Sequence, residues 1–332
     1  MTLIQGTTKF LRLGVFRQPT ILPTTQMGRR LATDAGIKQT LPKEPLQQTD
    51  QRFQSFQLRG KVFAVTGGGR GLGLTMAEAL VEAGGEALDL LTNHESTVDI
   101  VHCLDRLPEP HEEFYTAQTR ANPHYGGSLH YHPLDVRDRD STNQIMSAIA
   151  DGKNRLDGLV AAAGVNHVES AINHSAADIE RIISINYTGA FTSATAAATQ
   201  MLNKQCQGSI LLVSSMSGMI ANKGMKSSIY NSSKAAVIQL ARSFAMEWSN
   251  IDREGRGGIR VNCLCPGHIV TPMAKMVMDK TPGTKEIWES ENMLGRLARP
   301  EEFRGIALLL MSNAGSFMTG STIVADGGHT AW

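Results

Sequence analysis

A tyrosine and a lysine four residues apart, Tyr230 and Lys234 in the segment YNSSK, are well suited to proton transfer. If this segment is helical, both side chains lie on one helix face, so the lysine ammonium can sit near the phenol. A free phenol has a pKa of about 10, and only about one in a thousand is ionised near neutral pH. A nearby cation that lowers this pKa by about 3 units, worth about 4 kcal/mol, makes Tyr230 a working acid or base.

Two further polar residues could complete a set that acts on an alcohol or carbonyl oxygen. Ser215 follows the apolar strand that begins at Ile210, and its hydroxyl could steady the substrate oxygen. Asn186 could hold a water molecule that links Lys234 to solvent. A tyrosine and a lysine at this spacing occur by chance in many helices. The four residues in this order, behind the glycine-rich turn described next, are improbable by chance.

The turn is TGGGRGLG, Thr66–Gly73, which follows the β-branched run Lys61–Thr66 and precedes a helical pattern over Leu74–Ala83. Glycines at such a junction let the backbone approach a pyrophosphate, and the helix amino terminus offers free N–H groups and partial positive charge. A glycine-rich turn without a ligand is the alternative, but the flanking strand and helix favour dinucleotide binding. The residues that we expect to contact the dinucleotide are Gly67, Arg70, Gly71, Leu72 and Gly73.

An acid that binds the adenosine ribose is expected about 20 residues after such a turn, at the end of the second strand. Asp105 ends the run Val101–Leu104, but it lies 32 residues after Gly73 (105 − 73). Removing Ala87–Ile100 would restore an ordinary spacing, so this segment is either a longer loop before the strand or the product of a mis-spliced gene model. A strand over Ala87–Leu91 is the alternative, but it has no suitable acid at its end.

Neighbouring residues give opposite indications about the cofactor. Asp105 can bind both ribose hydroxyls and would repel a 2′-phosphate, which favours NAD. Arg106 beside it could pair with a 2′-phosphate, which favours NADP. The choice stays open on these residues alone.

Apolar runs alternate with helical patterns from Leu58 onward, which predicts an α/β fold with a doubly wound parallel sheet and helices on both faces. We expect one Rossmann-type domain over residues 58–332. The strands are expected at 61–66, 156–162, 209–214 and 259–265, and the long helices at 178–202 and 234–248.

The bulk composition, 41% hydrophobic and 19% charged residues with a net charge of +1, is that of an ordinary globular protein. It gives no reason to expect nucleic acid or an anionic membrane as a partner. No apolar run approaches the roughly 18 residues of a membrane span. The four cysteines form no CxxC pair and have no zinc-like spacing, so we expect small buried thiols in a reducing compartment and no metal site.

Residues 1–33 contain no acid and carry several arginines and threonines, which is typical of a mitochondrial presequence; a cytosolic tail or a misassigned start is the alternative. Residues 34–57 resemble a linker, so we expect 1–57 to be a disordered tail. The expected location is therefore the mitochondrial matrix or, failing that, the cytoplasm.

From Leu58 to Trp332 the chain resembles the short-chain dehydrogenase/reductase family. Besides the turn and the residues Asn186, Ser215, Tyr230 and Lys234, the matches are Asp135-Val136, Ala163-Gly164, the run Pro266–Thr271 and Asp326-Gly327-Gly328. The resemblance implies a Rossmann domain, NAD(P), hydride exchange between an alcohol and a ketone, and a Ser–Tyr–Lys–Asn tetrad. It also implies that Asp135 and Val136 contact the adenine side, that Lys234 holds the nicotinamide ribose, and that Pro266, Ile269 and Thr271 line the nicotinamide end.

Two departures from the family pattern carry information. Ala161–Gly164 replaces an Asn-Ala-Gly motif, which removes a polar group that braces the sheet. Ser215 precedes Tyr230 by 15 residues (230 − 215) where 13 is common, and Ser217 would satisfy 13. We prefer Ser215, because SSMSGMIAN before YNSSK resembles the fungal polyol and ketose reductases of the mannitol, sorbose and arabinitol type.

The substrate is expected under the segment from His268 to Pro300, with Asn166 and His167 either facing it or lying on a surface loop. A polyol and a ketose, such as D-arabinitol and D-ribulose, are the expected pair, with NADP preferred to NAD because of the resemblance. Reduction of another ketone, such as a 3-oxoacyl thioester or a secondary-metabolite intermediate, and a non-catalytic NAD(P)-binding regulator are the alternatives. The resemblance further implies a homotetramer or homodimer.

Overall fold

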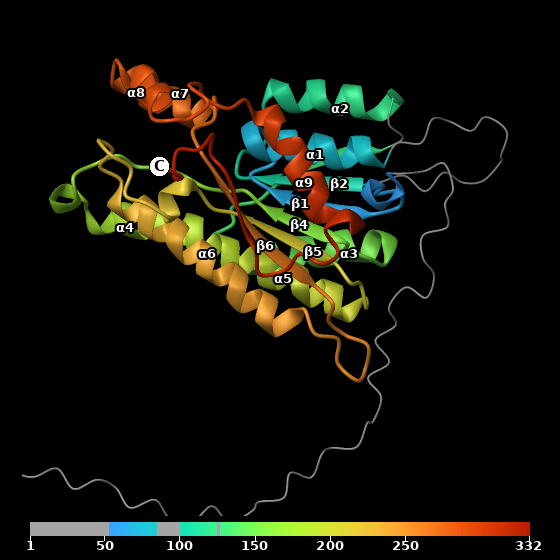
Figure 1. Ribbon diagram of the computed structural model, residues 1–332. Helices are drawn as coiled ribbons and strands as arrows, with labels where there is room; N and C mark the ends of the chain where they lie inside the picture. Colours follow the sequence, from blue (N-terminus) through green and yellow to red (C-terminus); the bar gives the residue numbers. More distant parts are fainter. Residues whose placement is uncertain (1–52, 85–99, 125–126) are drawn as a thin grey trace, which may run out of the picture. The chain divides into compact units, whose positions relative to one another are not determined.

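The computed structural model describes residues 53–84, 100–124 and 127–332. These residues form one parallel sheet in the order β3-β2-β1-β4-β5-β6-β7 (Figure 1). The strands are β1 (Val62–Thr66), β2 (Ile100–Asp105), β3 (Ser128–Pro133), β4 (Gly158–Ala161), β5 (Ser209–Val213), β6 (Arg260–Pro266) and β7 (Thr322–Ala325). The strand order reverses between β1 and β4, and ligands of such sheets bind outside the carboxyl ends of the strands at this reversal.

The helices are α1 (Gly71–Ala83), α2 (Glu112–His124), α3 (Arg139–Lys153), α4 (Ala176–Ile183), α5 (Ala190–Asn203), α6 (Ser228–Trp248), α7 (Pro272–Lys280), α8 (Thr284–Ser290) and α9 (Arg304–Met311). A π-helical segment, η3 (Ser184–Gly189), joins α4 to α5. Short 3-10 turns are η1 (Gln54–Phe56), η2 (Ala171–Asn173), η4 (Met216–Gly218), η5 (Pro300–Phe303) and η6 (Asn313–Gly315). Among the described helices, none is long and apolar enough to cross a membrane.

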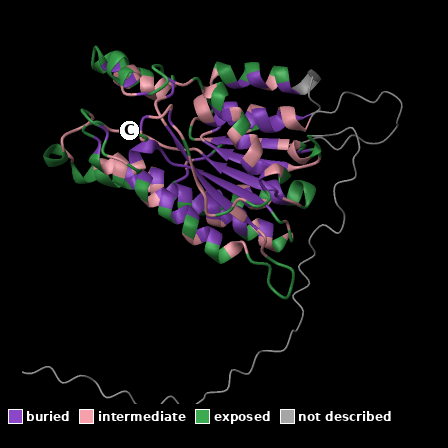
Figure 2. Cartoon of the chain, in the orientation of Figure 1, coloured by how far each residue is buried: buried purple, intermediate pink, exposed green. Residues whose placement is uncertain are grey.

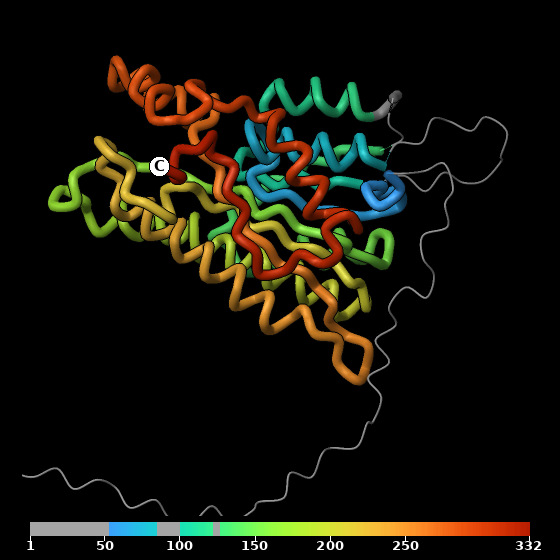
Figure 3. Tube along the Cα trace, viewed as in Figure 1, coloured from blue at the N-terminus to red at the C-terminus, as the bar shows by residue number. Residues whose placement is uncertain are grey.

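Helices cover both faces of the sheet, and the alternation of side chains along each strand supplies both cores. Val62 and Ala64 of β1 pack with residues of α3, α5 and α6, whereas Phe63 and Val65 pack with residues of α1, α2 and α9 (Figures 1 and 3). The three central strands, β1, β4 and β5, are therefore buried along their whole length (Figure 2). Continuous apolar runs such as these are expected when both faces of a parallel sheet are covered.

The expected α/β class, with a doubly wound parallel sheet, is confirmed, and the expected strands match β1, β4, β5 and β6 within two residues. The helix expected over 178–202 is interrupted by η3. Ile100 starts β2, so the expected insertion cannot include it, and the rest of that segment, 87–99, lies outside the described residues. Residues 1–52 of the expected tail also lie outside them, and η1 precedes the expected domain boundary at Leu58.

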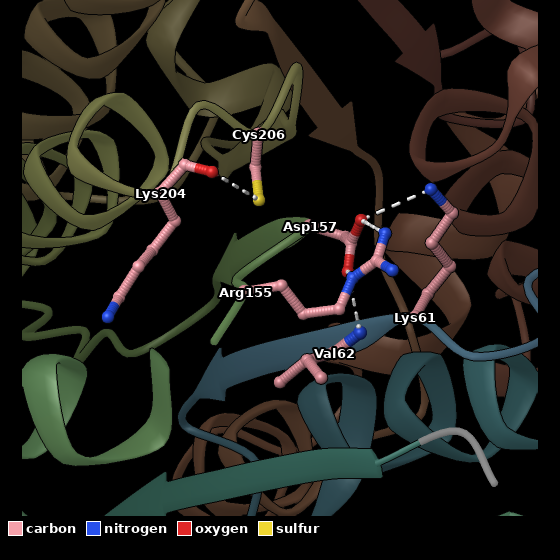
Figure 4. Close-up of polar contacts among 6 residues, drawn as sticks. All are labelled: Lys61, Val62, Arg155, Asp157, Lys204 and Cys206. Carbon is pink, nitrogen blue, oxygen red and sulfur yellow. Dashed lines mark hydrogen bonds and ion pairs between the residues drawn. The ribbon is translucent and has the colours of Figure 1, made fainter. Parts of the chain in front are cut away.

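Asp157 fastens the amino-terminal ends of β1 and β4, opposite to the carboxyl ends at which ligands of such sheets bind (Figure 4). Its carboxylate accepts hydrogen bonds from the Val62 N–H at 2.9 Å and from Arg155 Nε and Nη2 at 2.7 and 2.6 Å. Lys61 Nζ lies 3.1 Å from the same carboxylate. Burial raises the pKa of Asp157, but the bonds from Arg155 and Val62 and the charge of Lys61 outweigh it and hold the pKa below its ordinary value.

We expect Asp157→Ala to lower the free energy of unfolding by about 3 kcal/mol, because it leaves partly buried donors of β1 and Arg155 without an acceptor. Since the folded pKa of Asp157 is depressed, its contribution is complete above the unfolded value of 3.8 and is lost as the pH falls through the folded pKa. Urea titrations at pH 7 and pH 3 check this. Asp151→Ala is the control, because Asp151 is exposed and its partner is Lys204, and it should cost much less. Equal losses for both variants would contradict the prediction.

Candidate active site

The turn between β1 and α1 is shaped by glycines that no other residue could replace without movement. Gly67 and Gly71 have positive φ angles of 70° and 59°. A Cβ atom on Gly67 would lie 2.8 Å from the backbone nitrogen of Ala163, and one on Gly73 would collide with the carbonyl oxygen of Gly67. The loop after β4 and the start of α1 therefore both pack directly against this turn.

The amino terminus of α1 is open for a ligand. Its N-cap residue, the exposed Arg70, makes no side-chain capping bond, and the N–H of Gly71 reaches only the carboxylate of Glu113 at 3.5 Å. Leu72 lies half-buried on the first turn of the helix. Unsatisfied N–H groups at a helix terminus, lined by glycines, suit the pyrophosphate of a dinucleotide.

Asp105 ends β2 beside this turn, where the sequence predicted a ribose-binding acid. Its carboxylate accepts hydrogen bonds from the Gly69 N–H at 3.2 Å and from the Arg106 N–H at 2.8 Å. Asp135 follows β3 and pairs with the Arg137 guanidinium, whose hydrogen bonds outweigh burial and lower the pKa of the Asp135 carboxyl. Val136 next to it is buried. The expected adenosine-side residues thus gather at the carboxyl ends of β1, β2 and β3.

Ser215, Tyr230 and Lys234 meet at the carboxyl end of β5. Ser215 follows this strand, and the other two lie on the first turns of α6, with Lys234 Nζ 5.8 Å from the centre of the Tyr230 ring. The Ser214 hydroxyl donates to the carbonyl of Lys234 at 2.7 Å, which fastens α6 to the strand. A Cβ atom on Gly218 would lie 2.7 Å from the backbone of Lys234 and Ala235, so the approach is close.

Burial sets the proton affinities of both groups. Lys234 is 5% exposed and donates to the Val213 carbonyl at 3.0 Å. Desolvation lowers the pKa of Lys234 from 10.5 to about 8, and the nearby thiols of Cys263 and Cys265 act in the opposite sense. Desolvation also raises the pKa of Tyr230, while a side-chain hydrogen bond with Ser215 lowers it. Of the two candidate serines, Ser215 is the one that influences the Tyr230 pKa, and its catalytic role stays a prediction.

Asn186 lies in η3, and the π-helical segment turns its amide into the core. Its Oδ1 accepts from the Val165 N–H at 2.8 Å, and its Nδ2 donates to the Val165 carbonyl at 2.9 Å and to Ser233 Oγ at 3.0 Å. Ser233 in turn donates to the carbonyl of Tyr230 at 2.7 Å. These bonds use both amide protons of Asn186 and one of the two lone pairs on its Oδ1. The water link from Lys234 to solvent stays a prediction.

Gly164 separates Asn186 from Lys234. A Cβ atom on Gly164 would lie 3.3 Å from Lys234 Nζ and 3.4 Å from Asn186 Oδ1. The backbone of Ala163 and Gly164 thus runs directly past the catalytic lysine. A bulkier residue at 164 would fill the space in which a ligand can approach the ammonium group.

The residues expected at the nicotinamide end follow β6. Pro266 ends this strand, and Ile269 is 5% exposed and forms a β-bridge with Ala298. Thr271 caps α7 by accepting from the Ala274 N–H at 3.3 Å. A Cβ atom on Gly71 would lie 3.6 Å from Pro272, so the start of α7 stands over the glycine turn.

Helices α7 and α8 form a lid, defined here as Pro272–Ser290, which one aromatic stack holds to the sheet. The imidazole of His268, just after β6, stacks on Trp288 of α8 with ring centres 4.0 Å apart and planes 7° apart. Burial, and secondarily His329, lower the pKa of His268 to about 3, so the ring is neutral. His329 meets it edge-on at 5.3 Å. The lid is thereby joined both to β6 and to the carboxy-terminal segment.

These residues fit a nicotinamide dinucleotide. The glycine cradle and the open terminus of α1 suit the pyrophosphate, Asp105 and Val136 the adenosine side, and the space beside Lys234 the nicotinamide ribose. No cluster of metal-ligating residues occurs in the described ranges. All four cysteines are free, and three of them are buried.

Sequence patterns alone did not indicate Ser233 and Asn222. Their hydrogen bonds to Tyr230 and Ser217 support the candidate catalytic residues. Ser233 was visible only as the fourth residue of YNSSK, and Asn222 only as the last residue of SSMSGMIAN. Sequence patterns also gave no hint of a polar cavity of about 560 Å³ lined by Lys61, Arg155, Asp157 and Lys204, which are among the residues drawn in Figure 4. That cavity lies at the amino-terminal ends of β1 and β4, so it is not part of the catalytic site.

A parallel sheet with a dinucleotide turn, and a serine, a tyrosine and a lysine meeting at its carboxyl edge, defines an NAD(P)-binding oxidoreductase. A family model described as enoyl-(acyl carrier protein) reductase matches residues 110–330. A short-chain dehydrogenase/reductase of Aspergillus versicolor is 37% identical over 280 residues, covering 84% of this chain and 90% of that protein. The chain belongs to the short-chain dehydrogenase/reductase family, and it is an NAD(P)-dependent enzyme that acts on CH–OH groups.

Named polyol enzymes are among the relatives. A ribulose-forming D-arabinitol 2-dehydrogenase of Scheffersomyces stipitis is 32% identical, covering 84% of this chain and 96% of that one. An NADP-dependent mannitol dehydrogenase of Hypocrea jecorina is 30% identical, covering 86% and 98%. The crystal structure of a short-chain type dehydrogenase/reductase from Mycobacterium marinum superposes with a TM-score of 0.72 at 32% identity, covering 84% and 98%. The predicted resemblance to the fungal polyol reductases is confirmed.

Lys234 gives a prediction that links stability to catalysis. The pKa of Lys234 is 10.5 in the unfolded chain and about 8 in the folded one, so charging the amine disfavours folding. This cost is absent above pH 10.5, grows as the pH falls, and is complete below pH 8. We expect Lys234→Met to raise the free energy of unfolding at pH 7 by about 2 kcal/mol while abolishing turnover. Denaturant titrations at pH 7 and pH 10 check this, with Lys223→Met on an exposed loop as the control. A Lys234→Met variant that is less stable than the wild type at pH 7 would be the contrary result.

Proposed function

We propose that this enzyme interconverts a polyol and a ketose, such as D-arabinitol and D-ribulose, with NADP preferred to NAD. The observation that carries the proposal is that the serine which follows β5 and influences the Tyr230 phenol is Ser215, at the longer spacing of 15 residues (230 − 215). This spacing falls within the SSMSGMIAN pattern of the polyol reductases. The D-arabinitol and mannitol dehydrogenases among the relatives support the same substrate class.

In the proposed mechanism each of the three residues has its own role at the substrate oxygen. In the direction of ketone reduction, Ser215 donates a hydrogen bond to the carbonyl oxygen, and Tyr230 delivers its phenolic proton to that oxygen. Lys234 stabilises the resulting phenolate by its charge, from a position about one helical turn away. When bound, the nicotinamide cofactor supplies or accepts the hydride. In alcohol oxidation the same residues act in reverse, with Tyr230 as the base.

A reductase of a less polar ketone is the second candidate. The lid and the segment after it expose apolar side chains that a polyol would not need: Met276, Ile287, Met293 and Leu294 are each at least half exposed. The Aspergillus versicolor relative is also more similar to this chain than the polyol enzymes reported above. A substrate with an apolar portion would cover this surface.

We expect Tyr230→Phe to lower kcat by about 10³-fold on every substrate that the wild type turns over, because it removes the proton donor and keeps the ring. The assay is a panel of pentitols, hexitols, ketoses and apolar ketones with NAD(H) and NADP(H). Tyr115→Phe, which changes an exposed residue of α2, is the control and should retain full activity.

The panel separates the two candidates. Turnover of pentitols or hexitols supports the polyol assignment, whereas turnover of apolar ketones alone assigns the second candidate. Undiminished turnover by the Tyr230→Phe variant would refute the mechanism for both.

NADP preference rests on charge beside the ribose site. Arg106 and Arg70 are both exposed and flank the turn at which Asp105 is held by two backbone N–H groups. Because the Asp105 carboxylate is engaged in these bonds, the two guanidinium groups can outweigh its repulsion of a 2′-phosphate. The NADP-dependent mannitol dehydrogenase is a relative with this cofactor.

We expect Arg106→Ala to lower kcat/KM for NADPH by about tenfold and to change that for NADH by less than about twofold, because the side chain would contact only the 2′-phosphate. Initial rates with each cofactor at fixed substrate measure the ratio. Arg139→Ala, which removes an exposed arginine at the start of α3, is the control. Equal losses with both cofactors would count against a 2′-phosphate contact.

Assembly and location stay predictions. For a homotetramer or homodimer, α5 and α6 are the expected pairing surfaces, and they expose Phe191 and Met246. Such exposed apolar side chains on neighbouring helices suit self-association. Mitochondrial import would depend on residues 1–33, which lie outside the described ranges.

A further inference from the structure

Two buried polar residues in the connection between β5 and α6 have no role in the proton transfer described above. Ser217 and Asn222 are 5% and 8% exposed, and Ser215 is 8% exposed. Burying this many polar groups costs free energy unless they bond to one another. Ser217 is also the residue whose spacing to Tyr230, 13 residues (230 − 217), is the commoner one in the family.

Hydrogen bonds link the three residues in series, through the side chains of Asn222 and Ser215 and through both the side chain and the main chain of Ser217. Asn222 Nδ2 donates to Ser217 Oγ at 2.6 Å, and the Ser217 N–H donates to Ser215 Oγ at 3.1 Å. The second bond makes Ser215 the N-cap of η4. Because a hydroxyl has one proton and two lone pairs, accepting from Ser217 leaves the Ser215 proton free to be donated elsewhere.

The connection between β5 and α6 is hydrogen-bonded to α6, which fixes the position of these three residues relative to that helix. Asn231 Nδ2 donates to the Ile220 carbonyl at 3.4 Å, and Ser227 Oγ donates to Asn231 Oδ1 at 2.9 Å. Asn231 lies between Tyr230 and Lys234 in sequence. Asn222 is thereby held relative to the same helix that carries the catalytic tyrosine.

We propose that Ser217 and Asn222 are positioning residues: the bond between their side chains fixes the main chain at Ser217, whose N–H holds the Ser215 hydroxyl in the orientation that donates to the substrate oxygen. The proposal rests on the proposed function for its kinetic consequence. It gives the longer Ser–Tyr spacing a physical meaning: the serine at the commoner spacing serves as a support, and the substrate-facing hydroxyl is two residues earlier.

A brace, meaning hydrogen bonds that stabilise the loop without influencing Ser215, would have different effects when these bonds are removed. If Ser215 turns away, Tyr230 loses the influence of the serine hydroxyl, which lowers the pKa of the phenol against the effect of burial, so that pKa rises. A brace without influence on Ser215 changes the melting temperature and leaves the tyrosine titration where it was. The pKa of Tyr230 therefore separates positioning from bracing.

The experiment compares Ser217→Ala, Asn222→Ala, the double variant and Ser217→Thr, with Ser215→Ala as the reference and Lys223→Ala as the control on the same loop. Tyrosine labelled with ¹³C at Cζ allows NMR titration, and the chain has only five tyrosines. We expect Ser217→Ala and Asn222→Ala to move the Tyr230 titration upward toward that of Ser215→Ala. Ser217→Thr, which keeps the hydroxyl, and Lys223→Ala should titrate like the wild type.

In kinetics, each alanine variant should lower kcat by about tenfold with less than about a twofold change in KM, since the bond to Ser215 matters most in the transition state. The double variant should lose no more than the single ones, because both act through one hydrogen-bond chain. Additive losses, or an unmoved Tyr230 titration in Ser217→Ala, would overturn the proposal. If the wild type turns over no substrate, the proposed function fails, and the titration still decides the positioning role.

Discussion

A buried ammonium group constrains the whole carboxyl edge of this sheet. Lys234 can keep its charge in the interior only because the Val213 carbonyl accepts from it and because α6 approaches β5 closely at Gly218. The same approach brings Tyr230 to Ser215, and the glycine at 164 leaves the space in front of the amine. The candidate catalytic site is thus arranged around one buried ammonium group. The packing of the sheet beneath it offsets the free-energy cost of desolvating that group.

The elements that the sequence predicted well are those whose side chains are buried on both faces. The runs that became β1, β4, β5 and β6 are continuous and apolar, and the glycines at 67, 71 and 73 mark a turn that few other structures need. The candidate catalytic residues were predicted by type and order, because their chemistry restricts the residue types at fixed intervals. The serine at 215 was preferred to the one at 217 by resemblance, and it is the one that influences the Tyr230 pKa.

Other features depend on contacts between residues distant in sequence, which a linear pattern does not reveal. The π-helical segment at 184–189 looks like ordinary helix in sequence, and it arises where Asn186 turns inward to bond Val165. The clamp of Asp157 on β1 joins residues 95 positions apart. Hydrophobic periodicity gives no signal for a carboxylate whose partners come from a neighbouring strand.

The stacking of His268 on Trp288 joins the lid to the sheet in a way that lets residues of the two parts be substituted separately during evolution. The lid meets the rest of the molecule at this neutral, largely apolar contact, at Pro272 over the glycine turn, and at the short segments that join it to β6 and α9. Its exposed side chains, such as Met276 and Ile287, can therefore change by substitution without disturbing the ammonium group. An enzyme built in this way can acquire new substrates by drift in a few exposed methionines and leucines, while its proton-transfer apparatus is inherited intact.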